Sequence, residues 1–274
     1  MIAAGDIVTY KNSNLVEDWT VVLPRRRKCT RKYPRLPGPK QDEKPWFSTD
    51  LQFDRPRYSL VVQKVHLCLK KLENSKFFRL FMSQIQNNTI WDHFSKARGS
   101  NLKMQMVIYG IGSIESLDAS RLQLSLAILM KRKLDWIGNI EVFDPILSAT
   151  ESRVLESFGC SVIKINEQGR RRAVKPTLFF MPHCEAFLYE NLLEVNWEKY
   201  LLTNMVILGN RFSEYKKHAS VAKDSMLSDS RKHILAACEF TGEFTIDVVS
   251  DDFFRAFHET SWLFFNTKMI KVSL

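Results

Sequence analysis

The sequence predicts an α/β fold: a doubly wound, Rossmann-like, mostly parallel sheet with helices on both faces. Short apolar runs alternate with longer stretches in which apolar residues recur at helical spacing. The apolar run 106–109 leads directly into a glycine turn and a long helical pattern, which is how a βαβ unit begins. We expect the strand order 3-2-1-4-5, with a crevice where the first and fourth strands separate.

Composition limits the class of protein. The chain has 274 residues, 45% of them hydrophobic and 12% aromatic, which is typical of a globular protein with one core and an appendage. No apolar run approaches the ~18–20 residues that span a bilayer, and the N-terminus lacks a signal-peptide pattern. We therefore expect a soluble, intracellular protein. The five cysteines are scattered and form no C-x-x-C pair, which argues against a disulfide framework or a zinc ribbon.

Residues 1–57 are predicted to be basic, proline-rich and largely extended. Residues 24–40 contain eight lysines or arginines and no acid, so most of the net charge of +10 is local. Such a cluster suits nuclear import or contact with nucleic acid. An import role or a loosely electrostatic role is favoured over sequence-specific reading of DNA, because no recognition helix adjoins the cluster. Its members are Arg25, Arg26, Arg27, Lys28, Arg31 and Lys32.

The α/β domain is expected to span residues 58–265, and residues 266–274 form a tail. It begins with a helical pattern over 58–87. Asn74 and Ser75 divide this pattern into two helices, and Ser75 is expected to cap the start of the second helix. A short amphipathic stretch follows at 90–94. We expect these helices to cover one face or edge of the sheet.

The glycine turn after the first strand is the first candidate binding feature. Gly110 and Gly112 allow the backbone to approach a ligand, and the following helix, which we expect Ser113 to cap, supplies free N–H groups. The third glycine of a dinucleotide fingerprint is missing, and Glu115 beside the turn disfavours a pyrophosphate. A ligand site and a plain tight turn both remain open.

The second predicted strand, 140–143, ends at Asp144. An acid at this position holds ribose hydroxyls in dinucleotide-binding folds, although the spacing from Gly110 exceeds the usual ~20 residues. Alternatively, Asp144 caps the next helix, expected at 150–158 and ended by Gly159. A third strand follows at 161–165.

Two further strands, 176–181 and 204–210, end at polar residues of the same rim. The fourth ends at Pro182, His183 and Cys184, which suit a ligand pocket. We expect no metal centre, since adjacent residues rarely ligate one ion, and keep His183 or Cys184 as a weaker haem-ligand option. After the fifth strand, Asn210, Ser213 and Tyr215 are expected to face the crevice.

The C-terminal part is expected to contain a helix at 228–240 and an extended stretch at 245–249. Residues 261–265 are predicted to form a last strand, antiparallel at the edge of the sheet.

Several motifs together resemble the SRR1-like domain family. The resemblance is strong over residues 98–215, and the segment DWTVVLPRRRK (18–28) also resembles the opening of plant members. One departure is the triplet 118–120 after the glycine turn. The matching motifs are YGIGS (109–113), ASRLQL (119–124), VFDP (142–145), PTLFFMPHC (176–184), LYENLLEVNW (188–197) and ILGNRFSEY (207–215).

The resemblance implies a regulator rather than a defined enzyme. Plant members act in circadian-clock input and phytochrome B-linked red-light signalling that affects flowering time, in nucleus and cytoplasm, which implies signalling or clock proteins as partners. Animal members are linked to haem biosynthesis. From the residues we expect a non-catalytic protein that binds a nucleotide, S-adenosylmethionine or haem at the crevice. An S-adenosylmethionine-type transferase is the enzymatic alternative, and sequence-specific nucleic-acid binding or a membrane role is not expected.

Overall fold

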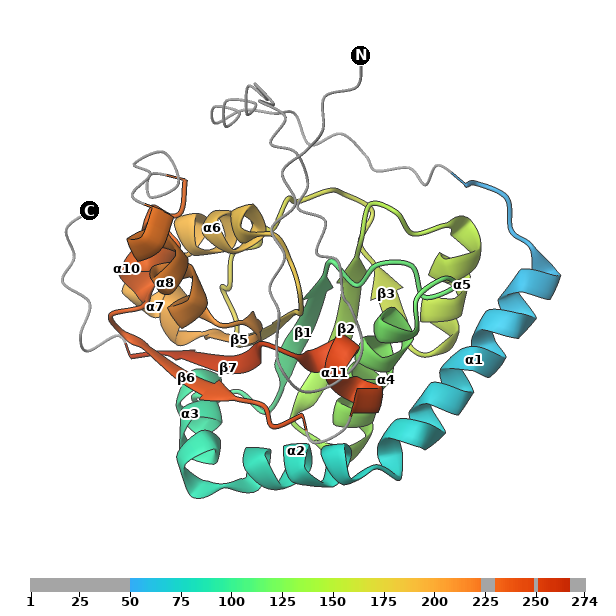
Figure 1. Cartoon of the computed structure of the whole chain (residues 1–274), viewed down its shortest axis with the longest axis horizontal. Helices are drawn as coiled ribbons and strands as arrows, with labels where there is room; N and C mark the ends of the chain where they lie inside the picture. Colours follow the sequence, from blue (N-terminus) through green and yellow to red (C-terminus); the bar gives the residue numbers. More distant parts are fainter. Residues whose placement is uncertain (1–49, 223–229, 249–250, 267–274) are drawn as a thin grey trace, which may run out of the picture. The chain divides into compact units, whose positions relative to one another are not determined.

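The computed structural model describes residues 50–222, 230–248 and 251–266, all within the unit formed by residues 42–274. Their centre is a seven-stranded sheet in the order β3-β2-β1-β4-β5-β7-β6 (Figure 1). The first five strands along the chain are parallel and have the predicted order 3-2-1-4-5. The prediction of a doubly wound α/β fold is confirmed.

The parallel strands bring four polar chain segments to one edge. β1 (Met104–Tyr109) lies between β2 (Ile137–Phe143) and β4 (Thr177–Met181), with β3 (Cys160–Val162) and β5 (Met205–Asn210) on the outer sides. The strand sequences are apolar nearly throughout because helices cover both faces of the sheet. The carboxyl ends of β1, β2, β4 and β5 therefore share one rim, which we call the carboxyl edge.

The last two strands are antiparallel. β7 (Thr260–Phe265) pairs with β5, and β6 (Thr241–Thr245) pairs with β7. The antiparallel direction of the final strand is as predicted, but its position at the edge is wrong, because β6 lies outside it. β6 also begins four residues before the expected extended stretch. β7 lies between β5 and β6, inside the sheet, and Trp262 and Leu263 are fully buried on its opposite faces.

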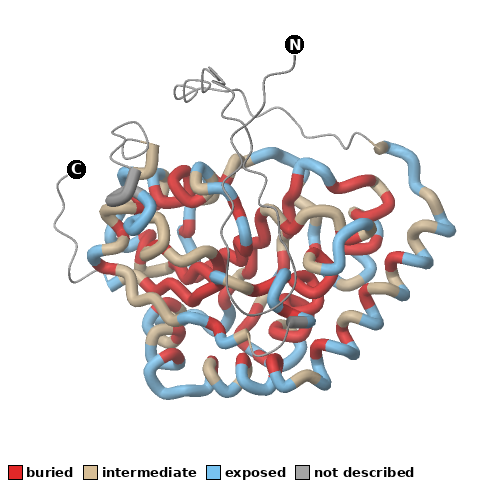
Figure 2. Tube along the Cα trace, in the orientation of Figure 1, coloured by how far each residue is buried: buried red, intermediate tan, exposed pale blue. Residues whose placement is uncertain are grey.

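Two layers of helices cover the sheet, and alternate strand residues face alternate layers. Met106 and Ile108 of β1 face the first layer, whereas Val107 and Tyr109 face the second. Figure 2 shows the buried residues concentrated in the sheet and along the inner sides of the helices. The first layer contains α1 (Arg55–Glu73), α2 (Lys76–Gln86), α3 (Asn88–Arg98), α4 (Asp118–Lys133), α5 (Ala149–Ser157) and α11 (Asp251–Phe257). The second layer contains α6 (Ala186–Val195), α7 (Lys199–Thr203), α8 (Phe212–Ala222) and α10 (Lys232–Ala237).

Local capping residues explain where several helices begin. Asp54 accepts the N–H of Arg57 at 2.8 Å, and Pro56 stands in the first turn of α1, where it removes no helical hydrogen bond. Ser75 accepts the N–H of Phe78 at 3.0 Å, so the predicted break and cap between α1 and α2 are confirmed. α3 is longer than its predicted core, whereas α10 begins only at Lys232 and is shorter than predicted.

The start of α4 differs from the prediction. The helix begins at Asp118, five residues after Ser113, and its N-cap residue Leu117 makes no capping hydrogen bond. Ser113 accepts the N–H of Ser116 at 3.1 Å and so closes the preceding turn rather than the helix. Leu117 is 51% exposed because it lies at this turn, before the first residue of the helix.

In the part of the chain that the structure describes, no helix combines the length and the apolar character required to cross a bilayer. Four cysteines in this part carry free thiols: Cys68, Cys160, Cys184 and Cys238.

Candidate functional site

The predicted site residues converge on the carboxyl edge. Gly110, Gly112 and Ser113 follow β1, Asp144 follows β2, the segment 182–184 follows β4, and Asn210 ends β5. Hydrogen bonds join the loop after β1 to those after β2 and β4, and the loop after β4 to the end of β5. The convergence that the strand order required is therefore present.

Asp144 binds the glycine turn directly. Its side chain is 6% exposed, and its two oxygens accept the N–H of Gly112 at 2.7 Å and the N–H of Ile146 at 3.0 Å. Gly112 adopts a φ of +74°, a left-handed conformation that presents its N–H to the carboxylate. The predicted capping of α5 by Asp144 is wrong, because Ser148 caps that helix. The carboxylate instead ties the β2 loop to the β1 loop.

Cys184 packs against the other glycine of the turn. Its thiol donates to the carbonyl of Tyr109 at 3.2 Å, and a Cβ added to Gly110 would lie 2.6 Å from the sulfur. Gly110 also has a φ of +67°, so both space and backbone conformation require glycine there. Burial raises the pKa of the Cys184 thiol well above its usual range, which keeps the thiol protonated and a poor nucleophile.

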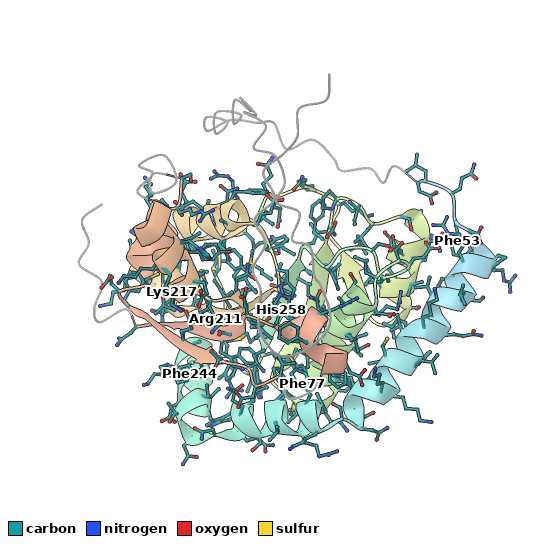
Figure 3. All side chains as sticks on the ribbon, in the orientation of Figure 1. Phe53, Phe77, Arg211, Lys217, Phe244 and His258 are labelled. Atoms are coloured by element: carbon teal, nitrogen blue, oxygen red, sulfur yellow. The ribbon has the colours of Figure 1, made fainter. Side chains whose placement is uncertain are left out.

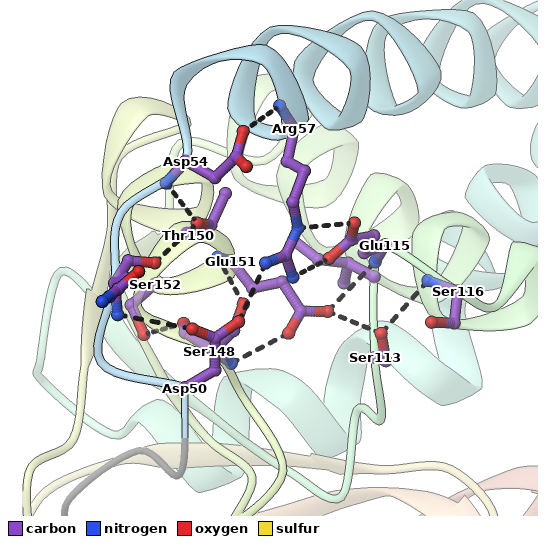
Figure 4. A network of polar contacts seen from close by, with 12 residues as sticks. Asp50, Asp54, Arg57, Ser113, Glu115, Ser116, Ser148, Thr150, Glu151 and Ser152 are labelled. Carbon is purple, nitrogen blue, oxygen red and sulfur yellow. Dashed lines mark hydrogen bonds and ion pairs between the residues drawn. The ribbon is translucent and has the colours of Figure 1, made fainter.

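Ser113 belongs to a partly buried polar network centred on Glu151 (Figure 4). Its hydroxyl donates to Glu151 Oε1 at 2.7 Å, and the same oxygen accepts the N–H of Glu115 at 3.0 Å. Glu151 Oε2 accepts the N–H of Ser148 at 2.9 Å, which completes a capping box at the start of α5. Glu151, only 2% exposed, therefore caps one helix and fixes the glycine-turn loop at the same time.

Arg57 closes this network from α1. Its guanidinium donates to both oxygens of Glu115 at 2.9 and 2.6 Å and to Asp50 at 2.9 Å. The hydrogen bonds from Arg57 hold the pKa of the Glu115 carboxyl below its usual value. The N-terminus of α1 is thus attached to the loop that follows β1, as Figure 4 shows.

His183 has a conformation unusual for its residue type. Its φ is +57°, its N–H donates to Asn210 Oδ1 at 2.8 Å, and its ring Nε2 lies 3.2 Å from the carbonyl of Ala256 in α11. The ring of His258 packs beside it at 4.4 Å. His183 therefore connects the β4 loop to β5 and to the C-terminal helix.

Asn210 is the hub at the end of β5. Its side-chain amide donates to the carbonyl of Cys184 at 2.9 Å and to the hydroxyl of Tyr215 at 3.0 Å, and its backbone N–H donates to the hydroxyl of Tyr189 at 2.8 Å. The hydroxyl of Tyr215 thus lies at the carboxyl edge, in contact with Asn210. Ser213 points elsewhere, since its hydroxyl donates to Glu243 of β6 at 2.7 Å.

These contacts limit the chemistry of the edge. The amide of Gly112 is already bound to a carboxylate, and three acids surround the turn, so a phosphate would meet occupied donors and negative charge. Ligand hydroxyls or a cationic group suit this environment better. The residues do not fit an axial haem ligand as placed, because Cys184 is a buried protonated thiol and His183 Nε2 contacts a carbonyl. Among the described residues, no group of three or more metal-binding side chains is present.

Three residues of the edge were not singled out from the sequence. Arg57 and Glu151 lie far along the chain from Ser113 and Glu115. The capping-box pattern Ser148-x-x-Glu151 is a sequence signal that could have identified Glu151. Tyr189 is fully buried, and its hydroxyl donates to the carbonyl of Met181. In the sequence it lies within a helical pattern, which does not distinguish it from an ordinary core residue. The basic cluster of Arg25, Arg26, Arg27, Lys28, Arg31 and Lys32 lies outside the described residues.

Comparison with solved structures gives distant matches. The plantazolicin methyltransferase BpumL, in complexes with SAH alone or with SAH and a desmethylPZN analog, is 12% identical, with TM-scores of 0.31 over 77–78% of this chain and 98–100% of that chain.

Comparison with known sequences gives much closer matches. The chain is 49% identical over 94% of both chains to Protein SENSITIVITY TO RED LIGHT REDUCED 1 of Arabidopsis thaliana. It is 31% identical over 72% of its length, and 86% of the relative's, to an SRR1-like protein of Mus musculus. The family model of the SRR1 domain matches residues 69–264, which includes every loop of the carboxyl edge. The chain belongs to the SRR1 domain family.

Proposed function

We propose that this chain is a regulatory protein of red-light signalling and circadian-clock input, which acts in nucleus and cytoplasm through signalling or clock proteins. The observation that carries the proposal is the 49% identity over 94% of both chains to the Arabidopsis relative, whose name records reduced sensitivity to red light. Identity at this level over 94% of both chains makes a shared role the simplest expectation.

The carboxyl edge supports a binding role for this regulator rather than a covalent one. Its cysteine is a buried thiol that donates to a carbonyl, and its histidine contacts a carbonyl rather than a serine or cysteine. A nucleophile and its base need mutual hydrogen-bond reach, and these two side chains bond elsewhere. The edge suits a small ligand that brings hydroxyl donors to Asp144, with regulation by contact to α11 through His183.

The role is tested by complementation. Arabidopsis plants that lack the relative are transformed with this chain, and seedling elongation in red light is measured. Restoration of the wild-type response is expected. A chain that accumulates to the normal level and leaves the response unrestored would contradict the proposal, with the Arabidopsis protein as positive control.

A second candidate is an S-adenosylmethionine-type transferase, favoured by the carboxylate of Asp144 at the end of β2 beside a turn with two left-handed glycines. The acidic surroundings suit a sulfonium better than a phosphate. Calorimetry with S-adenosylmethionine is expected to show binding that Asp144→Ala abolishes. Glu156→Ala, a surface variant of α5, serves as control, and equal affinity of both variants would remove this candidate.

A further inference from the structure

The outer strand of the sheet has one unpaired side. The bonds Asn266 N–H to Phe240 carbonyl at 2.7 Å and Ile246 N–H to Thr260 carbonyl at 3.1 Å show which residues of this segment face β7. In an antiparallel pair these residues alternate with residues whose backbone groups point away. The backbone N–H and C=O groups of Thr241, Glu243 and Thr245 therefore point outward from β6.

Little protects this edge. Gln84 of α2 donates its side-chain amide to the carbonyl of Thr245 at 2.6 Å. In the part of the chain that the structure describes, the outward N–H and C=O of Glu243 have no hydrogen-bond partner. Exposed edges usually carry charged side chains, especially lysine, or proline or a bulge that prevents pairing. The strand sequence TGEFT contains no lysine or proline, and the carboxylate of Glu243, its only charged group, is bonded to Ser213. The edge is therefore able to accept another strand.

A groove adjoins the same edge on the side of α2 and α3. It has a volume of about 420 Å³, and its apolar lining includes Leu80 of α2 with Phe244 and Ile246 at β6. Figure 1 shows β6 running beside α2 and α3, and Figure 3 shows Phe244 on that side of the strand. Leu80 is 39% exposed, so its side chain adds accessible apolar surface to the groove.

Two polar groups indicate what kind of segment fits. The amide oxygen of Gln84 is buried and has no hydrogen-bond partner, so it offers an acceptor for an N–H group. Among the lining residues, Asp247 carries the only charge, and its carboxylate makes no ion pair within the described residues. A lysine or arginine of such a segment would pair with Asp247, an N–H group of the segment would donate to Gln84, and an apolar side chain would fill the groove.

We propose that β6 and this groove bind an extended segment of a partner protein, which adds to the sheet as an eighth strand. The backbone of the segment bonds to Thr241 and Glu243 and replaces or shares the contact of Gln84 at Thr245. One apolar side chain fills the groove, and a neighbouring basic side chain pairs with Asp247. This mode of recognition combines backbone hydrogen bonds for affinity with a side-chain pocket for specificity.

A second copy of this chain fits the edge less well. When two β6 strands pair antiparallel about their common centre, Glu243 of one copy faces Glu243 of the other. Like charges placed directly opposite each other destabilise a strand pair. The observations therefore favour a different protein, whose basic residue pairs with Asp247, over a second copy of this chain.

The test uses the full chain and a display library of random short peptides as the probe. Selected peptides are expected to carry an apolar residue next to lysine or arginine. Leu80→Ser should raise the Kd of a selected peptide about tenfold or more, because it removes part of the groove. Leu67→Ser, on α1 and 68% exposed, is the matched control and should leave the Kd unchanged.

Amide hydrogen exchange followed by NMR distinguishes edge addition from other binding. The N–H of Glu243 should exchange fast in the free chain and at least about tenfold more slowly with the peptide bound. N-methylation of alternate peptide amides should abolish this protection. Failure to select peptides, or binding that survives N-methylation, overturns the proposal. Protection that instead rises with chain concentration, with dimers seen by light scattering, also overturns it in favour of a second copy.

Discussion

Buried carboxylates hold the loops of the carboxyl edge together. Asp144 accepts two backbone N–H groups, and Glu151 accepts two more and a hydroxyl, so each acid joins segments that are distant in the sequence. A buried donor left without its partner costs more than the hydrogen bond itself contributes. Single substitutions at these acids should therefore have large effects.

Asp144→Ala is expected to lower the free energy of unfolding by about 1–3 kcal/mol, because it leaves the partly buried N–H of Gly112 without its acceptor. Urea denaturation measures the change. Glu156→Ala removes a surface ion pair with Arg153 and should change stability by less than about 0.5 kcal/mol. Equal midpoints for the two variants would show that Asp144 does not hold the turn.

His183 should make stability depend on pH. Partial burial lowers its pKa below the ordinary 6.5, and the charge of His258 lowers it further, while Glu259 and the carbonyl of Ala256 act in the opposite direction. A histidine whose pKa is lower in the folded chain than in the unfolded chain binds fewer protons when folded. Acid therefore favours the unfolded chain.

The stability of the wild type should therefore fall, relative to that of His183→Gln, as the pH is lowered from about 7 to about 5. Melting temperatures of both proteins across this range provide the measurement. A difference between them that stays constant with pH would mean that His183 titrates alike in the folded and unfolded chains.

At the scale of secondary-structure elements, the loops after β1 and β4 fit into each other. The sulfur of Cys184 occupies the space that a side chain at Gly110 would need. The glycine is therefore required by a neighbour from a distant part of the chain as well as by its own backbone conformation.

Gly110→Ala should destabilise the protein by about 2 kcal/mol or more, of which about 1–2 kcal/mol comes from the left-handed backbone. In a Cys184→Ala background the same substitution should cost less, because the clash with the sulfur is gone. A double-mutant cycle by urea denaturation measures this coupling. Equal costs in both backgrounds would contradict the close packing of the two loops.

At the scale of the whole domain, the core joins early and late parts of the chain. Phe77 of α2 stacks on Phe257 of α11 at 4.8 Å, and both belong to the same buried cluster as Met106 and Ile108 of β1. The helices before the first strand and the helix before the last strand therefore form one cooperative layer.

Phe257→Ala should cost about 3–5 kcal/mol and keep a single unfolding transition, because a fully buried ring is removed from this shared layer. Phe254→Ala, in the same helix but 54% exposed, should cost much less. Calorimetry of both variants checks the difference. Two separate transitions in Phe257→Ala would show that α11 unfolds independently of the sheet.

Local signals were sufficient for much of the architecture. Ser75 caps a helix after a visible break, and the runs at 106–109 and 176–181 are apolar enough to identify buried parallel strands. With the strands known, the handedness of their connections implies the order 3-2-1-4-5 and one shared carboxyl edge. The prediction that Ser113 caps α4 was wrong, because a turn closed by the hydrogen bond between Ser116 and Ser113 intervenes before the helix begins.

The sequence alone determined the class of fold, the family and the set of loops that meet at the carboxyl edge, since these depend on periodicity and on motifs within single segments. Only the tertiary structure decided the partners: Asp144 with Gly112, Glu151 with Ser113, and β6 outside β7. These pairings join residues that are far apart along the chain. Many partners of similar polarity are compatible with the sequence, and packing in three dimensions selects among them.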